Sequence, residues 1–236
     1  MNEHIVKSYE DELNTLTAEC ARMGGLTEAQ VADGLDAVIK RDQALAEQVI
    51  ARDEKLDVLQ ADIERKAIRL IALRQPMAND LRRTVAAMKI ATNLERCGDL
   101  AKSIAKRTII LVSAESMTPL TRSIERMGRL VVGRLKEVLD AYTSSNDGQA
   151  VSVWTRDAEV DEHYNSLFRE LLTYMMADPR TITACAHLLF VAKNLERIGD
   201  HATNIAEIIH YEITGDEMIA ADRPRTDALP TVGDKT

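Results

Sequence analysis

Two heptapeptides of nearly the same sequence carry acidic residues at a spacing that suits cation binding. Residues 93–99 read Asn-Leu-Glu-Arg-Cys-Gly-Asp, and residues 194–200 read Asn-Leu-Glu-Arg-Ile-Gly-Asp. Each places a Glu and an Asp four positions apart, so on an α-helix both carboxylates leave from the same face. The spacing predicts two helical faces on which a pair of carboxylates can share one bound metal ion.

Each motif also destabilises the helix that carries it. Like charges at this spacing cost a helix about 0.2–0.5 kcal/mol, and a glycine inside a helix costs about 1 kcal/mol relative to alanine. Gly98 and Gly199 occupy corresponding places in the two motifs. Because both costs occur twice, we expect something outside the helix to offset them. A bound cation would do so, and so would a second helix packed closely against the glycine.

The heptapeptides belong to a longer internal repeat. Residues 16–37 align with residues 120–141 at an offset of 104 without a gap, whereas the heptapeptides are 101 residues apart. An internal repeat of this length indicates a tandem duplication of one unit slightly over a hundred residues long. The offset of 104 also adds a second acidic pair to each half: Asp53 and Asp57 in the first, Asp157 and Asp161 in the second.

Apolar periodicity and helix breakers predict an all-α fold of six long helices. They run over about residues 4–40, 42–73 and 80–113 in the first half; in the second half they run from 118 to a turn at 144–148, from that turn to Asp178-Pro179, and on to Gly215. Asn79 or Asp80 is expected to cap the third helix. We therefore expect two tandem three-helix bundles, residues 1–115 and 116–215, followed by a disordered tail over 216–236.

Composition narrows the class of protein. The chain of 236 residues is 45% hydrophobic but only 3% aromatic, and its apolar runs are much shorter than the roughly 20 residues that span a bilayer. A formal net charge of −8 weighs against nucleic acid and anionic membranes as direct partners. The N-terminal residues lack the pattern of a secretory signal, so a cytoplasmic location is expected. Cys20, Cys97 and Cys185 are expected to be reduced thiols.

Residues 74–82 (Arg-Gln-Pro-Met-Ala-Asn-Asp-Leu-Arg) and 193–207, together with the duplication, resemble the PhoU family of phosphate-transport accessory proteins. The resemblance extends over roughly residues 4–217. It implies an all-α cytoplasmic protein, usually a homodimer, that has no enzymatic activity and represses phosphate-starvation signalling. It also implies contacts with the phosphate ABC transporter, through its ATPase subunit, and with a sensor histidine kinase.

Several members of that family bind metal through the acidic motifs. The resemblance therefore implies eight candidate ligands, Glu95, Asp99, Glu196 and Asp200 on the third helices and Asp53, Asp57, Asp157 and Asp161 on the second helices. Carboxylate ligands suit Mg²⁺, Mn²⁺ or iron, whereas a thiolate-bound zinc site would need clustered cysteines. The identity of the metal, among Mg, Mn, Fe and Zn, stays open, and no catalytic or cofactor-binding residue is implied.

The two motifs differ in the residues that follow them. Lys102 and Lys106 follow the first motif, where Thr203 and Glu207 follow the second. We therefore expect the first site to be weaker or internally ion-paired. An alternative for every acidic pair is a solvated helix face with ion pairs to neighbours, for example Asp99 with Lys102.

Two other functions are compatible with a helical bundle rich in carboxylates. A ferritin-like dinuclear metal oxidase needs two Glu-x-x-His pairs, but only Glu207 and His210 form one, and residues 106–109 have neither ligand. A metal-free helical scaffold would keep the same fold and partners. Nucleotide-binding glycine motifs are missing from the sequence, so nucleotide chemistry within this chain is not expected.

Overall fold

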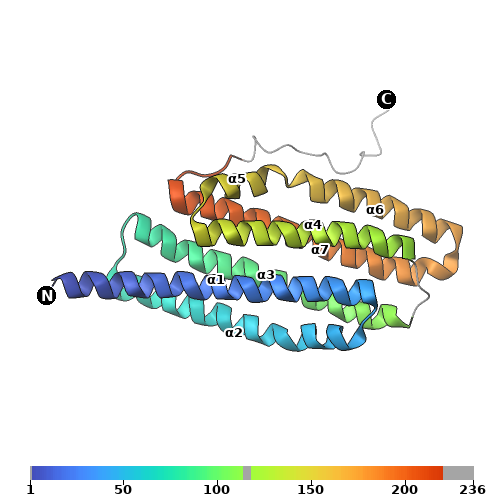
Figure 1. Ribbon diagram of the computed structural model, residues 1–236, viewed down its shortest axis with the longest axis horizontal. Helices are drawn as coiled ribbons and strands as arrows, with labels where there is room; N and C mark the ends of the chain where they lie inside the picture. Colours follow the sequence, from blue (N-terminus) through green and yellow to red (C-terminus); the bar gives the residue numbers. More distant parts are fainter. Residues whose placement is uncertain (1, 114–117, 220–236) are drawn as a thin grey trace, which may run out of the picture.

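Helices make up almost all of the computed structural model, which describes residues 2–113 and 118–219. Within these ranges there is no strand. The helices lie side by side along the long axis of the molecule (Figure 1). In chain order they are α1 (Asn2–Lys40), α2 (Gln43–Arg74), α3 (Asn79–Val112), α4 (Thr118–Ser144), α5 (Asp147–Thr155), α6 (Ala158–Ala177), the 3₁₀ turn η1 (Pro179–Thr181) and α7 (Ile182–Thr214).

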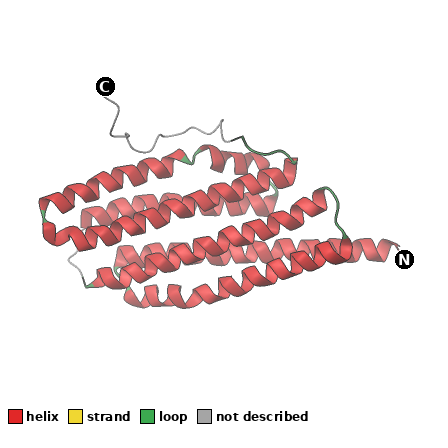
Figure 2. Ribbon diagram, turned by 180° about the vertical axis from the view of Figure 1, so that it is seen from behind, coloured by secondary structure: helices red, strands yellow, loops and turns green. Residues whose placement is uncertain are grey.

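The helices form two bundles, which confirms the expected all-α architecture. Helices α1, α2 and α3 pack on one another, and α4, α5, α6 and α7 form the second bundle. In Figure 1 the first bundle, blue to green, lies along the second, yellow to red, and Figure 2 shows the same two layers from behind. The bundles meet where α3 packs on α7 and where α1 packs on α4. The first and third helices of one half therefore contact their counterparts in the other.

The seam between α3 and α7 uses the asparagines that begin the two heptapeptides. Asn93 Oδ1 lies 2.9 Å from His201 Nδ1, and Asn194 Nδ2 donates to Ser103 Oγ at 3.0 Å. Residue numbers rise along α3 while they fall along α7, so the two helices are antiparallel. Each heptapeptide thus fixes the opposite half with its asparagine.

At the crossing of α1 and α4, a leucine of each half packs against a glycine of the other. A Cβ added to Gly128 would lie 2.2 Å from Leu35 Cδ1, and one added to Gly24 would lie 2.5 Å from Leu139 Cδ2. Gly24 corresponds to Gly128 and Leu35 to Leu139 in the repeat. The identical residues that reveal the duplication thus form a reciprocal contact between the halves.

The fifth expected helix is interrupted, and this part of the prediction was wrong. Helix α5 ends at Thr155, and α6 begins at Ala158. The buried Arg134 explains the break because its guanidinium donates to the carbonyl oxygens of Val153, at 3.3 Å, and Arg156, at 3.1 Å. Both carbonyls also accept backbone hydrogen bonds, but from the N–H groups three residues further on, those of Arg156 and Glu159, in place of the i+4 bonds of a continuous α-helix. In the first half Gln30 corresponds to Arg134, and α2 is continuous.

Two further expectations can be compared with the helix ends. The prediction that Asn79 or Asp80 caps α3 was wrong, because the N-cap is Ala78, with no side-chain hydrogen bond and a φ of 48°. The prediction of an end near Gly215 is confirmed, since this glycine closes α7 in the left-handed conformation with a φ of 85°. Residues 216–219 are not helical. The rest of the expected tail lies outside the described residues.

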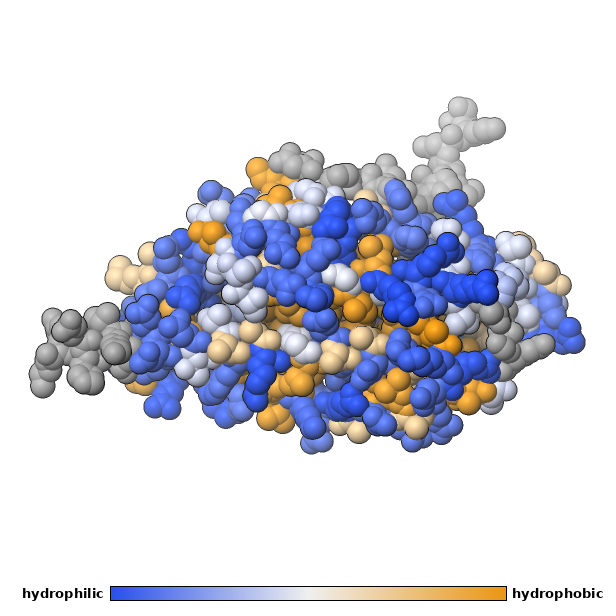
Figure 3. All heavy atoms as spheres, in the orientation of Figure 1, coloured by the Kyte–Doolittle hydropathy of each residue, from blue (hydrophilic) through white to orange (hydrophobic). Residues whose placement is uncertain are grey.

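The core contains the apolar faces of every α-helix. All three cysteines are free, as expected, and all three are also buried. Polar residues cover most of the face seen in Figure 3, with apolar side chains scattered among them. Over the described ranges, no helix combines the length and apolar character that crossing a bilayer requires.

We expect Gly128→Ala to destabilise the protein by about 1 kcal/mol or more, because Leu35 must leave its buried rotamer and overpacking of a core costs about 1–3 kcal/mol. Gly133→Ala on the same helix is the matched control. A Cβ there meets no atom within 4 Å, so it should stabilise by up to about 1 kcal/mol through helix propensity. Urea unfolding measures both changes, and equal effects of the two variants would contradict the close α1–α4 crossing.

Candidate metal centre

Three of the eight candidate ligands come together in the second half. Carboxylate oxygens of Asp161 on α6 and of Glu196 and Asp200 on α7 all lie within 4.8 Å of one another. Among the described residues this is the one group of three or more His, Cys, Asp or Glu side chains with that spacing. The donors are all carboxylate oxygens, which suit hard cations such as Mg²⁺ and Mn²⁺. The donor set fits a metal.

Glu196 lies deepest in this group. Its side chain is 13% exposed, and Lys193 Nζ lies 2.6 Å from Oε1 and 2.5 Å from Oε2. The approach to Oε2 lacks the geometry of a hydrogen bond, so this buried oxygen accepts none from the described residues. The ammonium group of Lys193 therefore meets this oxygen by charge alone, and its side chain is 47% exposed, so a metal ion bound at this oxygen would replace a partner that reaches solvent.

The fourth acidic residue of the second half, Asp157, is held by its own neighbour. Thr203 Oγ1 donates to Asp157 Oδ1 at 2.6 Å. Asp157 lies in the break between α5 and α6, one turn before Asp161. The threonine brings no charge, and the lysine of this group, Lys193, is paired with Glu196.

Crowding of these carboxylates shows in the pKa of Asp200. The surrounding helices desolvate this carboxylate, although part of it reaches solvent, and the charges of Glu196, Asp157 and Asp161 repel its own. Together these effects raise the pKa of Asp200 to about 6. Repulsion of this kind is what a bound cation would remove.

The corresponding residues of the first half are arranged around a lysine. Lys102 Nζ lies 2.5 Å from Asp53 Oδ2 and 3.9 Å from Asp99 Oδ1. Arg96 adds a second cation, 3.5 Å from Glu95 and 3.7 Å from Asp99. The expectation that the first motif is internally ion-paired is confirmed by these contacts.

Desolvation is also the main cause of the raised pKa values of two carboxyl groups in the first half, those of Asp57 and Glu95. It raises the pKa of Asp57, with a further contribution from the charges of Asp53 and Asp99. It also raises the pKa of Glu95, although Arg96 opposes the effect. The hydrogen bond to Asp53 raises the pKa of Lys102, so this ammonium group stays charged.

Helix packing accounts for the glycine of each motif. A Cβ on Gly98 would lie 2.5 Å from Leu56 Cδ1, and a Cβ on Gly199 would lie 3.2 Å from Val160 Cγ1. Leu56 and Val160 are corresponding residues of α2 and α6. The close approach of the second helix explains the glycines without a ligand, as the packing alternative supposed.

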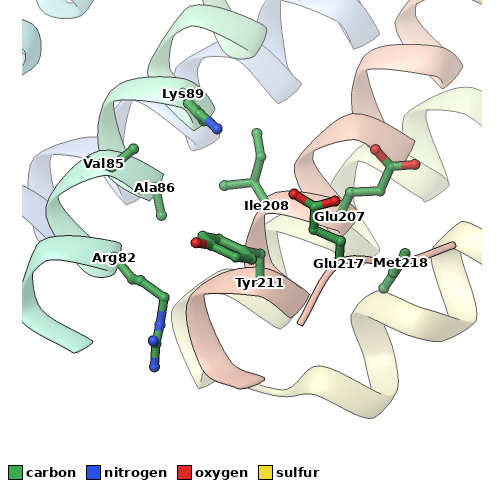
Figure 4. Close-up of a pocket in the computed structure, with 9 residues that line it drawn as sticks. All are labelled: Arg82, Val85, Ala86, Lys89, Glu207, Ile208, Tyr211, Glu217 and Met218. Carbon is green, nitrogen blue, oxygen red and sulfur yellow. The ribbon is translucent and has the colours of Figure 1, made fainter. Parts of the chain in front are cut away.

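A separate pocket of about 340 Å³ lies between α3 and α7 at the end near Gly215. Arg82 and Lys89 of α3 line one side, and Glu207, Tyr211 and Glu217 line the other (Figure 4). Charges of both signs therefore face one another across the pocket. This lining lacks the excess of positive charge that would attract phosphate.

Sequence reasoning missed two residues that organise the acidic groups. Gln30 Nε2 donates to Asp53 Oδ1 at 3.2 Å and to the Gly98 carbonyl oxygen at 3.3 Å. Arg134, its counterpart, breaks the helix before Asp161 and forms an ion pair with Glu159. The signal that could have found Gln30 and Arg134 is a polar residue on a helix face that is otherwise apolar.

Known proteins resemble the chain over nearly its whole length. The model of the PhoU domain matches residues 20–108 and again residues 124–209. A protein of Caulobacter vibrioides (strain NA1000 / CB15N), named phosphate-specific transport system accessory protein PhoU homolog, is 68% identical over 97% of this chain and 99% of its own. The phosphate-specific transport system accessory protein PhoU of Escherichia coli (strain K12) is 37% identical over 92% and 90%. The crystal structure of PhoU from Pseudomonas aeruginosa superposes with a TM-score of 0.85 at 37% identity, covering 88% of this chain and 100% of that chain.

The raised pKa of Asp200 predicts a pH-dependent stability in the presence of a chelator. Its folded-state pKa of about 6 exceeds the ordinary value of 3.8, so the folded protein binds more protons than the unfolded chain between these pH values, and stability falls as pH rises through the window. Asp200→Asn should therefore be about as stable as the wild type near pH 4 and more stable above pH 6. The gain should be about 1 kcal/mol, less than the whole shift implies, because solvent screens the carboxylate.

Urea unfolding across this pH range measures the effect. Asp140→Asn is the control, since Asp140 is an exposed acid of α4 that pairs with Lys136. A gain for Asp200→Asn that does not change with pH would contradict the crowding of carboxylates.

Proposed function

Since the chain belongs to the PhoU family, we propose that it is a non-catalytic regulator of phosphate homeostasis. It represses phosphate-starvation signalling and modulates phosphate import by contacting the phosphate ABC transporter, through its ATPase subunit, and the sensor histidine kinase. The observation that carries this proposal is the full-length likeness, with both repeats, to relatives named as phosphate-transport accessory proteins.

The protein acts in the cytoplasm as a homodimer and reaches the membrane through its partners. The family resemblance is the support for the dimer and the location. The pocket between α3 and α7 favours signalling through protein contacts over direct phosphate sensing, because its lining carries charges of both signs.

The second half also binds a metal ion through Asp161, Glu196 and Asp200. The support is the convergence of their oxygens within 4.8 Å of one another. Mg²⁺, Mn²⁺ or iron suits these ligands better than Zn²⁺ does. When bound, the cation supplies positive charge that offsets the repulsion of the carboxylates. The residues of α6 and α7 are thereby held together, which stabilises a surface for the dimer or for a partner.

The Glu-x-x-His pair that a dinuclear oxidase would use is engaged in other contacts. The Glu207 carboxylate accepts a hydrogen bond from Trp154 Nε1 at 2.9 Å, and His210 Nδ1 lies 2.6 Å from Asp147 Oδ1. Both ends of the Glu-x-x-His pair are therefore engaged in contacts between α5 and α7. The metal-free scaffold differs from the proposed regulator only in binding no metal. Measurement of bound Mn²⁺ distinguishes the two.

Deleting the chromosomal copy is expected to give constitutive expression of phosphate-starvation genes in phosphate-rich medium. The physical reason is that the kinase loses the contact that keeps it repressed. A transcriptional reporter measures the response, and re-expression of the intact chain should restore repression. Normal repression in the deletion strain would remove the regulatory proposal.

The double substitution Glu196→Gln and Asp200→Asn is expected to weaken Mn²⁺ binding at least tenfold, because it removes two of the three charged donors. Elemental analysis after dialysis against Mn²⁺ measures the bound metal. Asp140→Asn, which removes an exposed acid elsewhere, should leave it unchanged. Equal metal content in the wild type and the double variant would favour the metal-free scaffold.

A further inference from the structure

We propose that Lys102 serves as a built-in cation of the first half, so that the first acidic motif is closed to metal and the two halves use different cations for the same purpose. The comparison with the second half rests on the metal centre proposed above. The geometry around Lys102 stands without it.

The ammonium group of Lys102 is shared by two acidic residues. Lys102 Nζ lies between helices, at 2.5 Å from Asp53 Oδ2 of α2 and 3.9 Å from Asp99 Oδ1 of α3. It thus bridges the acidic residues of the second and third helices, as a cation bound to both motifs would. An ordinary ion pair on a helix surface connects neighbours on one helix and stays in solvent. This pair joins two helices, and the Asp53 side chain is only 2% exposed.

The lysine cannot leave this place without cost. Gln30 Nε2 donates to Asp53 Oδ1, so the two oxygens of this carboxylate accept from different side chains. Moving the ammonium group away would leave a buried negative charge with one amide donor in place of a cation. Removing one partner of a buried ion pair is strongly destabilising. A metal ion would have to displace a positive charge that the fold itself holds in place.

In the second half, the residue that corresponds to Lys102 is Thr203. Its hydroxyl keeps the hydrogen bond to Asp157, the counterpart of Asp53, but supplies no charge. Arg197, the counterpart of Arg96, forms no ion pair with any described residue, whereas Arg96 lies near both acids of its motif.

The carboxylates respond accordingly. The oxygens of the second half converge within 4.8 Å, and those of Asp57, Glu95 and Asp99 are not among the described groups that do so. The second half also has a lysine, Lys193, but its side chain is 47% exposed and it pairs with Glu196 three residues further along the same helix. Lys102 instead joins two helices at an aspartate that is 2% exposed, and there the ligand cluster is missing.

Exchanging the two residues tests the proposal. Mn²⁺ binding to the full-length protein is measured by titration calorimetry and by electron paramagnetic resonance of free Mn²⁺. Lys102→Thr should create Mn²⁺ binding in the first half that is at least tenfold tighter than any binding there in the wild type. Adding Asp99→Asn to this variant should remove the new binding. Thr203→Lys should abolish the binding that depends on Asp200. Lys106→Thr is the matched control, because Lys106 is exposed on the same helix and contacts no described acid.

A measurement on the unaltered protein covers the case in which Lys102→Thr fails to fold. Mn²⁺ should increase amide protection against hydrogen exchange on α6 and leave α2 unchanged. Protection of α2 by Mn²⁺, or loss of wild-type Mn²⁺ binding on Asp99→Asn, would overturn the proposal, as would a folded Lys102→Thr variant with no added site. If the wild type binds no Mn²⁺ but Lys102→Thr does so through Asp99, the metal centre of the second half fails while the role of Lys102 stands.

Discussion

The structure depends on a buried aspartate at the place where the second helix of a bundle crosses the glycine of the third. In the first half, Gly98 brings α3 so close to α2 that its backbone lies beside Leu56 and Asp53. A carboxylate at this depth must meet donors or a cation, because isolated burial of its charge is costly. Gln30 and Lys102 meet that requirement, and each comes from a different helix. One carboxylate therefore ties together all three helices of the bundle.

In the second half the corresponding aspartate, Asp157, is only partly buried, and its contacts have changed. Asp157 takes its hydrogen bond from Thr203, and Arg134 stands where Gln30 would be. The arginine is longer and charged, so it reaches past the aspartate to the carbonyl oxygens of Val153 and Arg156 and opens the helix there. Two differences between the repeats thus explain both the broken helix and the missing counterpart of the Lys102 charge in the second half.

The sequence was sufficient for the parts of the fold that repeat. Apolar periodicity, prolines and the duplication predicted the six helical segments and their two bundles, because these signals act locally or recur at a fixed offset. The broken helix escaped prediction because its cause, Arg134, lies on a different helix and acts through tertiary contacts. The position of Ala78 as the cap of α3 escaped for a similar reason, since local propensity favours Asn79 or Asp80. For the acidic residues, spacing indicated a shared face, but only the packing of α6 on α7 shows which oxygens converge.

The unequal halves suit a regulator better than two equal metal sites would. A lysine held by the fold gives the first bundle a cation at every metal concentration, so its contact with α7 stays constant. The second bundle carries a similar set of acidic residues, and the lysine beside them, Lys193, is half-exposed and pairs only along its own helix. In the proposal above, this half is the one that responds to metal ions. Asn93 and Asn194 join α3 to α7 through hydrogen bonds. A change in the second bundle would therefore act on these contacts with the first. In the function proposed above, metal binding in the second half would act against a first half whose cation is fixed, and a partner protein would detect the resulting change between the halves.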